Sequence, residues 1–365
     1  MNYIKNIDTI CILVNIENYE TSAKNTLEYL EEEKNKCKVL STVRNNYQHM
    51  INVGNMAFQI FQNGTKGYSY ILHNDGYQIN ISQHKSKIEN FYPIQIRISS
   101  EFLWSKGIIR AWSDIYKWIE LNFGKIIENK VYRIDVCLHT SDVNFTLNFE
   151  NIYKGKFKKR NINYNGSEIN CLYFGTRKGK NVFCRIYNKS LEIRETKSKY
   201  WFYDIWKNNS LNIENVWNLE FELKSEFLRE LQLKTIEDVC SNLPNLWKYC
   251  TKEWLVKVDR TKTRIERCPI NTQWLEIQKA YDEFNSRGFI ERKKQISMNA
   301  ETLIPSIVGN ITSYCARKNN INMEQAFDIL YKGTKKYLKN KETDFKSEVL
   351  KKKKLLETNI NKKEE

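Results

Sequence analysis

Hydrophobic and polar residues alternate along much of the first 225 residues, as they do in β-strands that bury one face. Helical patterns interrupt the series at 21–39, 101–123 and 190–201. Together the segments predict an α+β fold, with an antiparallel-rich β-sheet and flanking helices. The predicted strands cover residues 10–16, 56–61, 68–72, 77–81, 94–98, 131–139, 169–176, 181–188 and 216–224.

The pattern changes after Ser225, where helical periodicity replaces alternation. Helices are expected at 227–231, 235–256, 272–284, 299–317 and 323–338. We therefore predict four parts along the chain. They are an N-terminal strand and helix (1–40), an α+β domain (41–225), an α-helical module (226–340) and a Lys-rich tail (341–365) that is a frayed helix or disordered.

The charge of the chain points to a polyanionic partner. Of 365 residues, 59 are Lys or Arg and 43 are Asp or Glu, a net charge of +16. Nucleic acid is the first candidate for so basic a chain. The alternative is a solubilising surface with no such partner, and part of the Lys and Asn excess fits an AT-rich genome. A hydrophobic fraction of 41% excludes a wholly disordered chain.

Cysteine usage and hydropathy indicate the compartment. The nine Cys and four His residues lack the spacing of a zinc site, and the odd Cys count fits a reducing environment. No stretch approaches 18 apolar residues, and no export signal is recognisable. We expect a soluble cytoplasmic protein with no membrane partner.

Three of the predicted strands share an unusual face. Period two places Arg133, Asp135, Cys137 and His139 together on the first of them. The second carries Arg185, Tyr187 and Lys189 on one side, and the third carries Glu220, Glu222 and Lys224. If these strands pair, acids, cations and a tyrosine converge on one surface of the sheet.

That surface has two interpretations. Carboxylates and an imidazole on neighbouring strands can hold a divalent cation that polarises a phosphate, and a tyrosine hydroxyl beside cations can be activated as a nucleophile. The simpler interpretation is a solvated sheet face with cross-strand ion pairs.

Four short motifs favour the first interpretation. Tyr173-Phe-Gly-Thr-Arg177 is followed by Arg185-Ile-Tyr-Asn-Lys-Ser-Leu-Glu192, with Arg133-Ile-Asp135 upstream and Leu219-Glu-Phe-Glu-Leu-Lys224 downstream. In this order and spacing they resemble the replication initiation factor family (Rep_trans) of rolling-circle plasmids, phages and integrative elements. The resemblance covers roughly residues 50–285.

The resemblance implies a sequence-specific, metal-dependent endonuclease that nicks one DNA strand, with 41–225 as its nicking domain. The family's nucleophile corresponds to Tyr187, which would form a 5′-phosphotyrosine link and free a 3′ hydroxyl as a primer. Its metal-binding acids correspond to Asp135 and Glu220, and Glu192 is a further candidate ligand for Mg²⁺ or Mn²⁺. Arg185 and Lys189 would bind phosphate or stabilise phenolate, and Arg133 and Arg177 are candidate DNA contacts.

Two positions depart from the family pattern. His139 stands where members often have a second acid, and a neutral imidazole ligand would shift the preference toward Mn²⁺. A structural role for this histidine is equally open. Asn218 stands where members tend to have Arg, which removes one phosphate contact. Both departures concern the metal shell rather than the nucleophile.

A basic segment precedes the tyrosine motif. Lys158, Lys159 and Arg160 lie in a predicted loop or hairpin that either grips the DNA backbone or is a solvated turn. The resemblance also implies a homodimer that works with a host helicase and DNA polymerase. Two alternatives stay open: a relaxase that initiates conjugative transfer of a mobile element, and a catalytically inactive DNA-binding regulator.

Overall fold

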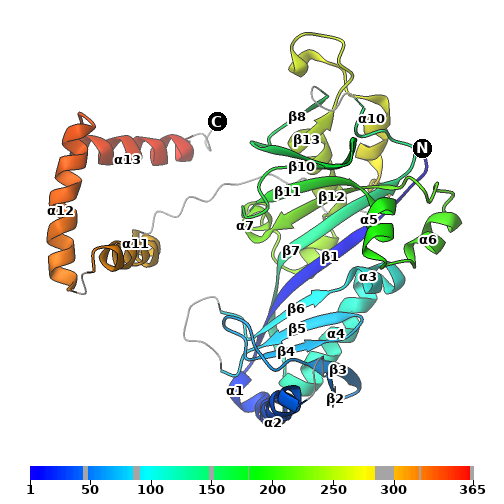
Figure 1. Ribbon diagram of the computed structural model, residues 1–365, viewed down its shortest axis with the longest axis horizontal. Helices are drawn as coiled ribbons and strands as arrows, with labels where there is room; N and C mark the ends of the chain where they lie inside the picture. Colours follow the sequence, from blue (N-terminus) through cyan, green and yellow to red (C-terminus); the bar gives the residue numbers. More distant parts are fainter. Residues whose placement is uncertain are drawn as a thin grey trace. The chain divides into compact units, whose positions relative to one another are not determined.

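The chain forms two compact units, Met1–Arg292 and Lys293–Glu365. The computed structural model describes residues 1–43, 48–84, 91–147, 152–179, 181–283, 300–319 and 322–361. The first unit contains an eleven-stranded antiparallel sheet flanked by helices, and the described part of the second is helical (Figure 1). The predicted α+β class with a helical C-terminal module is confirmed.

The first half of the sheet unit starts with a long strand and ends with two helices. Its elements are β1 (Tyr3–Ile16), α1 (Tyr19–Ser22), α2 (Lys24–Val43), β2 (His49–Val53), β3 (Met56–Ile60), β4 (Tyr70–His73), β5 (Tyr77–Ile81), β6 (Ile94–Ile98), α3 (Ser100–Lys106) and α4 (Ile108–Phe123).

The second half repeats this plan of a long strand followed by shorter ones. Its elements are β7 (Ile126–Thr140), β8 (Tyr153–Gly155), β9 (Arg160–Asn165), β10 (Glu168–Phe174), β11 (Val182–Asn188), α5 (Lys189–Thr196), α6 (Phe202–Asn208) and β12 (Trp217–Lys224). Then follow α7 (Ser225–Glu230), α8 (Ile236–Cys240), α9 (Leu243–Lys248), the π-helix η2 (Tyr249–Trp254), β13 (Leu255–Lys257), the 3₁₀ helix η3 (Ile265–Arg267) and α10 (Thr272–Lys279).

The two long strands lie side by side at the centre of the sheet. The strand order is β2-β3-β4-β5-β6-β1-β7-β12-β11-β10-β9, with antiparallel neighbours throughout, while β8 and β13 form a separate pair. Each half therefore returns to its own first strand, β6 to β1 and β12 to β7. This arrangement places the three strands with the polar face next to one another, which is the condition under which their polar residues were expected to converge.

The predicted domain boundaries differ from those of the structure. Strand β1 is central to the sheet, so residues 1–40 are not a separate part. Helices α7–α10 do not form a module with the later helices, because Phe227, Trp247 and Trp274 are buried in the same core as Val136 of the sheet. The boundary expected at 226 thus lies inside the first unit, whose helices are needed to cover the apolar face of β7 and β12.

Local chemistry explains other differences from the predicted elements. The helix expected over 101–123 is two helices, because Gly107 adopts a φ of 74° between α3 and α4. The helix expected over 235–256 becomes α8, α9, η2 and the strand β13, which pairs with β8. The Lys-rich tail carries a helix, α13 (Phe345–Asn361).

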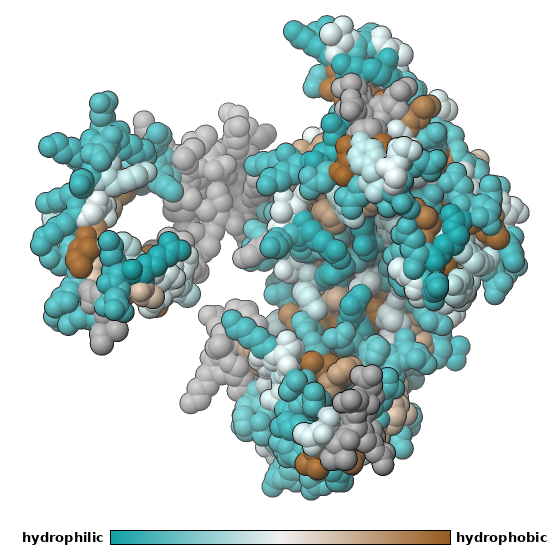
Figure 2. All heavy atoms as spheres, viewed as in Figure 1, coloured by the Kyte–Doolittle hydropathy of each residue, from teal (hydrophilic) through white to brown (hydrophobic). Residues whose placement is uncertain are grey.

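The second unit consists of η4 (Ala300–Leu303), α11 (Ile304–Arg317), α12 (Met323–Asn340) and α13. Among its described side chains only Ala326 is buried. The visible surface of the molecule is mainly hydrophilic, with scattered apolar residues (Figure 2). No helix in the described part of the chain has both the length and the hydrophobicity needed to cross a bilayer.

Candidate functional site

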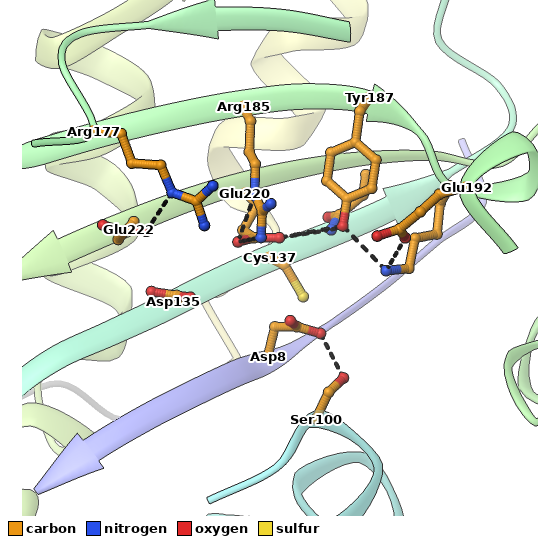
Figure 3. Close-up of polar contacts among 12 residues, drawn as sticks. Asp8, Ser100, Asp135, Cys137, Arg177, Arg185, Tyr187, Glu192, Glu220 and Glu222 are labelled. Atoms are coloured by element: carbon orange, nitrogen blue, oxygen red, sulfur yellow. Dashed lines mark hydrogen bonds and ion pairs between the residues drawn. The ribbon is translucent and has the colours of Figure 1, made fainter. Parts of the chain in front are cut away.

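The register of β11, β12 and β7 brings the polar residues into rows across the sheet. Arg185 is opposite Glu220, and Tyr187 is opposite Asn218. On the other side of β12, Asn218 is opposite His139. Their side chains share one face of the sheet, where Tyr187 and Arg185 point toward the strands that carry the carboxylates (Figure 3).

The hydroxyl of Tyr187 has three polar partners. It accepts hydrogen bonds from Nδ2 of Asn218 at 2.9 Å and from Nζ of Lys189 at 3.1 Å. Its proton points to Oε2 of Glu220 at 3.4 Å. The tyrosine is 8% exposed. A phenol with two donors on its oxygen and a carboxylate at its proton is arranged to lose that proton.

Burial sets the protonation state of this group. Burial raises the pKa of Tyr187, and the Lys189 ammonium only partly opposes this shift. Burial also raises the pKa of Glu220, although the neighbouring Arg185 lowers it. The phenol is therefore protonated at neutral pH and needs a base, and a carboxylate with a raised pKa is a better base than an ordinary one.

The carboxylates of the polar face are paired with arginines. Arg185 donates to Oε1 of Glu220 from Nε at 3.0 Å and from Nη2 at 2.6 Å. Arg133 donates to both oxygens of Asp135, at 2.8 and 2.5 Å, and its Nη2 lies 3.0 Å from Glu222. Burial raises the pKa of Asp135 despite Arg133, and the Glu220 charge adds to the shift.

Lys189 and Glu192 form a further pair beside the tyrosine. Lys189 is buried, and its Nζ lies 2.5 Å from Oε2 of Glu192. Burial disfavours the ammonium, but the Tyr187 and Glu192 oxygens raise the pKa of Lys189 above its ordinary value. The lysine is therefore a permanent cation in contact with the phenol oxygen.

His139 lies apart from the carboxylates in an aromatic pocket. Its Nδ1 accepts a hydrogen bond from Nε1 of Trp206 at 3.1 Å, and its ring stacks on Trp104 at 5.0 Å between centroids. Phe202 completes the pocket at 5.0 Å. Burial, with the charge of Lys189, lowers the pKa of His139 to about 3. Its Nε2 is buried with no hydrogen-bond partner among the described residues. The aromatic rings on its faces are nevertheless typical of a structural histidine, the alternative left open by its sequence position.

This environment predicts an acid-sensitive fold. An unfolded histidine takes up a proton near pH 6.5, whereas the folded one resists down to about 3, so its contribution to stability is present above 6.5 and lost as pH falls. Between pH 6.5 and 5 the loss is about 2 kcal/mol. In urea unfolding, His139→Phe is expected to lose less stability than wild type over this interval. Identical pH slopes would contradict the assignment.

Three hollows with shared lining residues lie on the polar face and at the ends of β7, β11 and β12. The first, of about 420 Å³, is lined by Asp8 and Asp135 and by a group of cations. A small one of about 180 Å³ contains Tyr187 and shares Arg185 with the first. A third, of about 730 Å³, continues beyond Asn188. The cations of the first hollow are Arg97, Arg133, Arg177, Arg185 and Lys199.

Asp8 also lines this site, although no pattern in the sequence indicated it. It is 5% exposed, and its Oδ1 accepts a hydrogen bond from the Ser100 hydroxyl at 2.7 Å. Burial opposes its charge, but Lys189 and Ser100 lower its pKa overall. The register of β1 on β7 shifts between Ile7 and Thr9, so Asp8 is an extra residue in the strand. Such a bulge leaves no signal in the alternation.

The remaining predicted DNA contacts are dispersed. Arg177 lines the first hollow, with 60% of its side chain exposed and its Nε 3.8 Å from Glu222. Lys158, Lys159 and Arg160 are exposed at the start of the edge strand β9 and line none of the three hollows. Of these four residues, only Arg177 therefore lies at the site.

The described residues do not form the predicted metal site as they stand. No three His, Cys, Asp or Glu side chains among them lie close enough to share an ion. Asp135 is paired with Arg133, Glu220 with Arg185 and Glu192 with Lys189, and His139 faces aromatic rings. Carboxylate oxygens suit Mg²⁺ and Mn²⁺ chemically, so metal dependence stays a prediction from the motifs.

The comparisons with known proteins leave the family open. No family model matches the chain, and no curated protein matches it, so the resemblance to the replication initiation factor family is not confirmed. One similar solved structure is a rolling circle replication initiator protein from Geobacillus stearothermophilus. It is 15% identical, with 79% of this chain and 100% of that chain covered and a TM-score of 0.46. A likeness at this level carries no argument about the site.

Proposed function

We propose that the protein nicks one strand of DNA, with Tyr187 as the nucleophile. The observation that carries this proposal is the set of three polar partners around the Tyr187 hydroxyl, on a sheet face rich in cations. A tyrosine that served only packing would not need a buried lysine, an amide and a carboxylate on its oxygen. The order of the sequence motifs supports the same assignment.

Glu220 acts as the general base in this proposal. It takes the phenol proton while the Tyr187 oxygen attacks the scissile phosphorus. A phosphotyrosine bond forms, and the bond from phosphorus to the 3′ oxygen breaks. The leaving oxygen takes a proton from water and becomes a 3′ hydroxyl. Lys189 and Asn218 donate to the tyrosine oxygen and stabilise its developing negative charge.

Arg185 links the tyrosine to the phosphate-binding region. It pairs with Glu220 and lines both the first hollow and the Tyr187 hollow. Arginine binds phosphate oxygens through its planar fork, and Arg133, Arg177 and Lys199 add positive charge to the first hollow. The DNA backbone next to the scissile phosphate is therefore proposed to lie over this group.

Asn218 has a defined part despite its departure from the family pattern. Its Nδ2 donates both to the Tyr187 oxygen, at 2.9 Å, and to Oε2 of Glu220, at 3.1 Å. A longer cationic side chain here would reach the phosphate, whereas the amide fixes the distance between nucleophile and base. In the proposal Asn218 therefore both contacts the reacting oxygen and positions the base beside it.

The biological role follows from the products. A 3′ hydroxyl beside a protein-linked 5′ end primes a polymerase, so we propose initiation of rolling-circle replication at an origin. The same chemistry at a transfer origin would make the protein a relaxase. Divalent metal dependence, dimerisation and a host helicase are the parts of the proposal that rest on the motif resemblance alone.

A covalent adduct provides the decisive test. The full-length protein is incubated with supercoiled DNA carrying the element's own origin, in Mg²⁺, in Mn²⁺ and with a chelator. We expect a nicked circle and a protein–DNA adduct that survives SDS, with mass spectrometry locating the nucleotide on Tyr187. Tight DNA binding without an adduct under every condition would favour the inactive regulator. An adduct on another residue would refute this mechanism.

A further inference from the structure

The third hollow, beyond Tyr187, is a polar cavity with no part in the reaction described above. Its volume is about 730 Å³, and side-chain amides supply much of its wall. They come from β9, β10, the end of β11 and the segment before β12. These amides belong to Asn165, Asn170, Asn188 and Asn215.

The cavity adjoins the hollow that contains Tyr187. Asn170, Asn188 and Leu191 line both this cavity and the Tyr187 hollow. The Tyr187 hollow in turn shares Arg185 with the arginine-lined hollow. A strand whose phosphate reached Tyr187 would therefore extend into cationic surroundings on one side and into amide surroundings on the other.

The arginine-lined hollow and the amide cavity differ in charge, so we expect them to bind different parts of a DNA strand. Among the described residues, Arg194 is the one cation that lines the amide cavity, and its Nη1 lies 2.9 Å from a carboxylate oxygen of Glu214. Asp142 and Glu168 add negative charge to the same wall. These surroundings disfavour a phosphate. Amides both donate and accept hydrogen bonds, so the cavity suits the edges of unpaired bases.

Asn170 is the amide best placed to contact such a base. The register of β10 on β9 shifts between Ile169 and Cys171, so Asn170 lies at a bulge in the strand. Its Oδ1 is buried and has no hydrogen-bond partner among the described residues. The next residue, Cys171, is directly opposite Tyr187. A buried acceptor without a partner is costly in the free protein. Asn170 lines both hollows, so we infer that its side chain turns this oxygen toward a bound base.

We propose that the amide cavity binds the base next to the cleaved phosphate of single-stranded DNA, with Asn170 as a residue that distinguishes one base from another. This inference rests on the proposed function, because Tyr187 defines which phosphate is cleaved. It assigns recognition of the local sequence to the nicking unit itself.

Base preference in binding tests the inference without requiring cleavage. The full-length protein is titrated, without added metal, into fluorescein-labelled dA, dT and dC homopolymers of about twelve nucleotides, and anisotropy is recorded. Wild type is expected to prefer one homopolymer by roughly tenfold. Asn170→Ala is expected to bind all three within about twofold, with an unchanged salt dependence because phosphate contacts remain.

Two further variants control for folding and for non-specific loss. Asn165→Ala alters the exposed rim of the cavity, where it removes a surface hydrogen bond to Glu195, and is expected to weaken the preference severalfold. Asn35→Ala, on the exposed face of α2, removes an amide far from the cavity in the fold and should keep the full preference. A preference that Asn170→Ala retains, or the absence of any preference in wild type, would overturn the inference.

The adduct assay keeps the two proposals distinguishable. A protein with an Asn170-dependent base preference that never forms an adduct would refute the nicking function but leave the base-binding cavity supported. A protein that forms the Tyr187 adduct and binds the three homopolymers equally would support nicking and refute the cavity.

Discussion

Tyr187→Phe is expected to form no SDS-resistant adduct and to leave supercoiled origin DNA uncut. The substitution removes only the oxygen that accepts from Lys189 and Asn218 and donates to Glu220. Without a nucleophile the proposed reaction has no first step, and removing such a group lowers turnover by up to roughly 10⁶-fold. Denaturing gel electrophoresis of the protein after incubation with labelled origin DNA measures the adduct directly.

Tyr173→Phe is the matched control for that experiment. Tyr173 also lines the Tyr187 hollow, but its ring stacks on Phe183 at 5.9 Å between centroids, and no lysine of the described residues contacts its oxygen. We expect this variant to form the adduct at the wild-type rate. If Tyr187→Phe still nicks while binding DNA normally, the nucleophile is another group.

Glu220→Gln is expected to lower the rate of adduct formation by roughly 10²- to 10⁴-fold, the range typical of a general base. Glutamine keeps the shape of the side chain but cannot take the phenol proton. Since burial raises the pKa of Glu220 above its ordinary 4.5, the wild-type rate should rise with pH through this raised value. The acid limb of the pH–rate profile should therefore lie above pH 4.5 and be absent from the variant.

Glu222→Gln is the control that separates the loss of a general base from the loss of one negative charge on the same sheet face. Glu222 lies on the same strand and pairs with Arg133 and Lys224, each at 3.0 Å, without contacting Tyr187. Its substitution is expected to leave the acid limb in place. Equal losses in both variants, with an unchanged pH profile, would mean that Glu220 acts only through the charge balance of the sheet face.

Stability has to be measured alongside these rates. Glu220→Gln leaves the partly buried Arg185 without a charged partner, and breaking a buried pair of this kind costs about 3–5 kcal/mol. The melting temperature and the affinity for origin DNA report whether the variant is folded. A folded variant that binds DNA and forms adduct slowly is the expected outcome.

The amino-acid pattern predicted the part of the site that depends on strand alternation. Period two assigned Asp135, Arg185, Tyr187 and Glu220 to a common face, and the antiparallel register of β7, β12 and β11 brings them together. Alternation is informative here because each strand buries one face in the core. A register shift of one residue would move every side chain to the opposite face of the sheet.

Other residues have meaning only through contacts distant in sequence. Asp8 enters the site at a bulge that pairs β1 with β7, and Ser100 reaches it from the start of α3. The position of His139 in its strand places it on the same face as the candidate metal ligands. Aromatic residues of α3 and α6 nevertheless surround it. In the sequence, Asn218 indicated only the loss of an arginine. Its contact with Tyr187 arises because β11 and β12 pair.

The sequence by itself thus determined the fold class and the polar and apolar faces of the strands, because these depend on local periodicity. Its short motifs led to the proposal that Tyr187 is the nucleophile. Only the tertiary structure decided the partners of Tyr187, the pairing of carboxylates with arginines and the extent of the first unit. Those features depend on which segments pack together. Packing brings residues as far apart in sequence as Asp8 and Lys189 close enough for the lysine charge to lower the pKa of the buried aspartate.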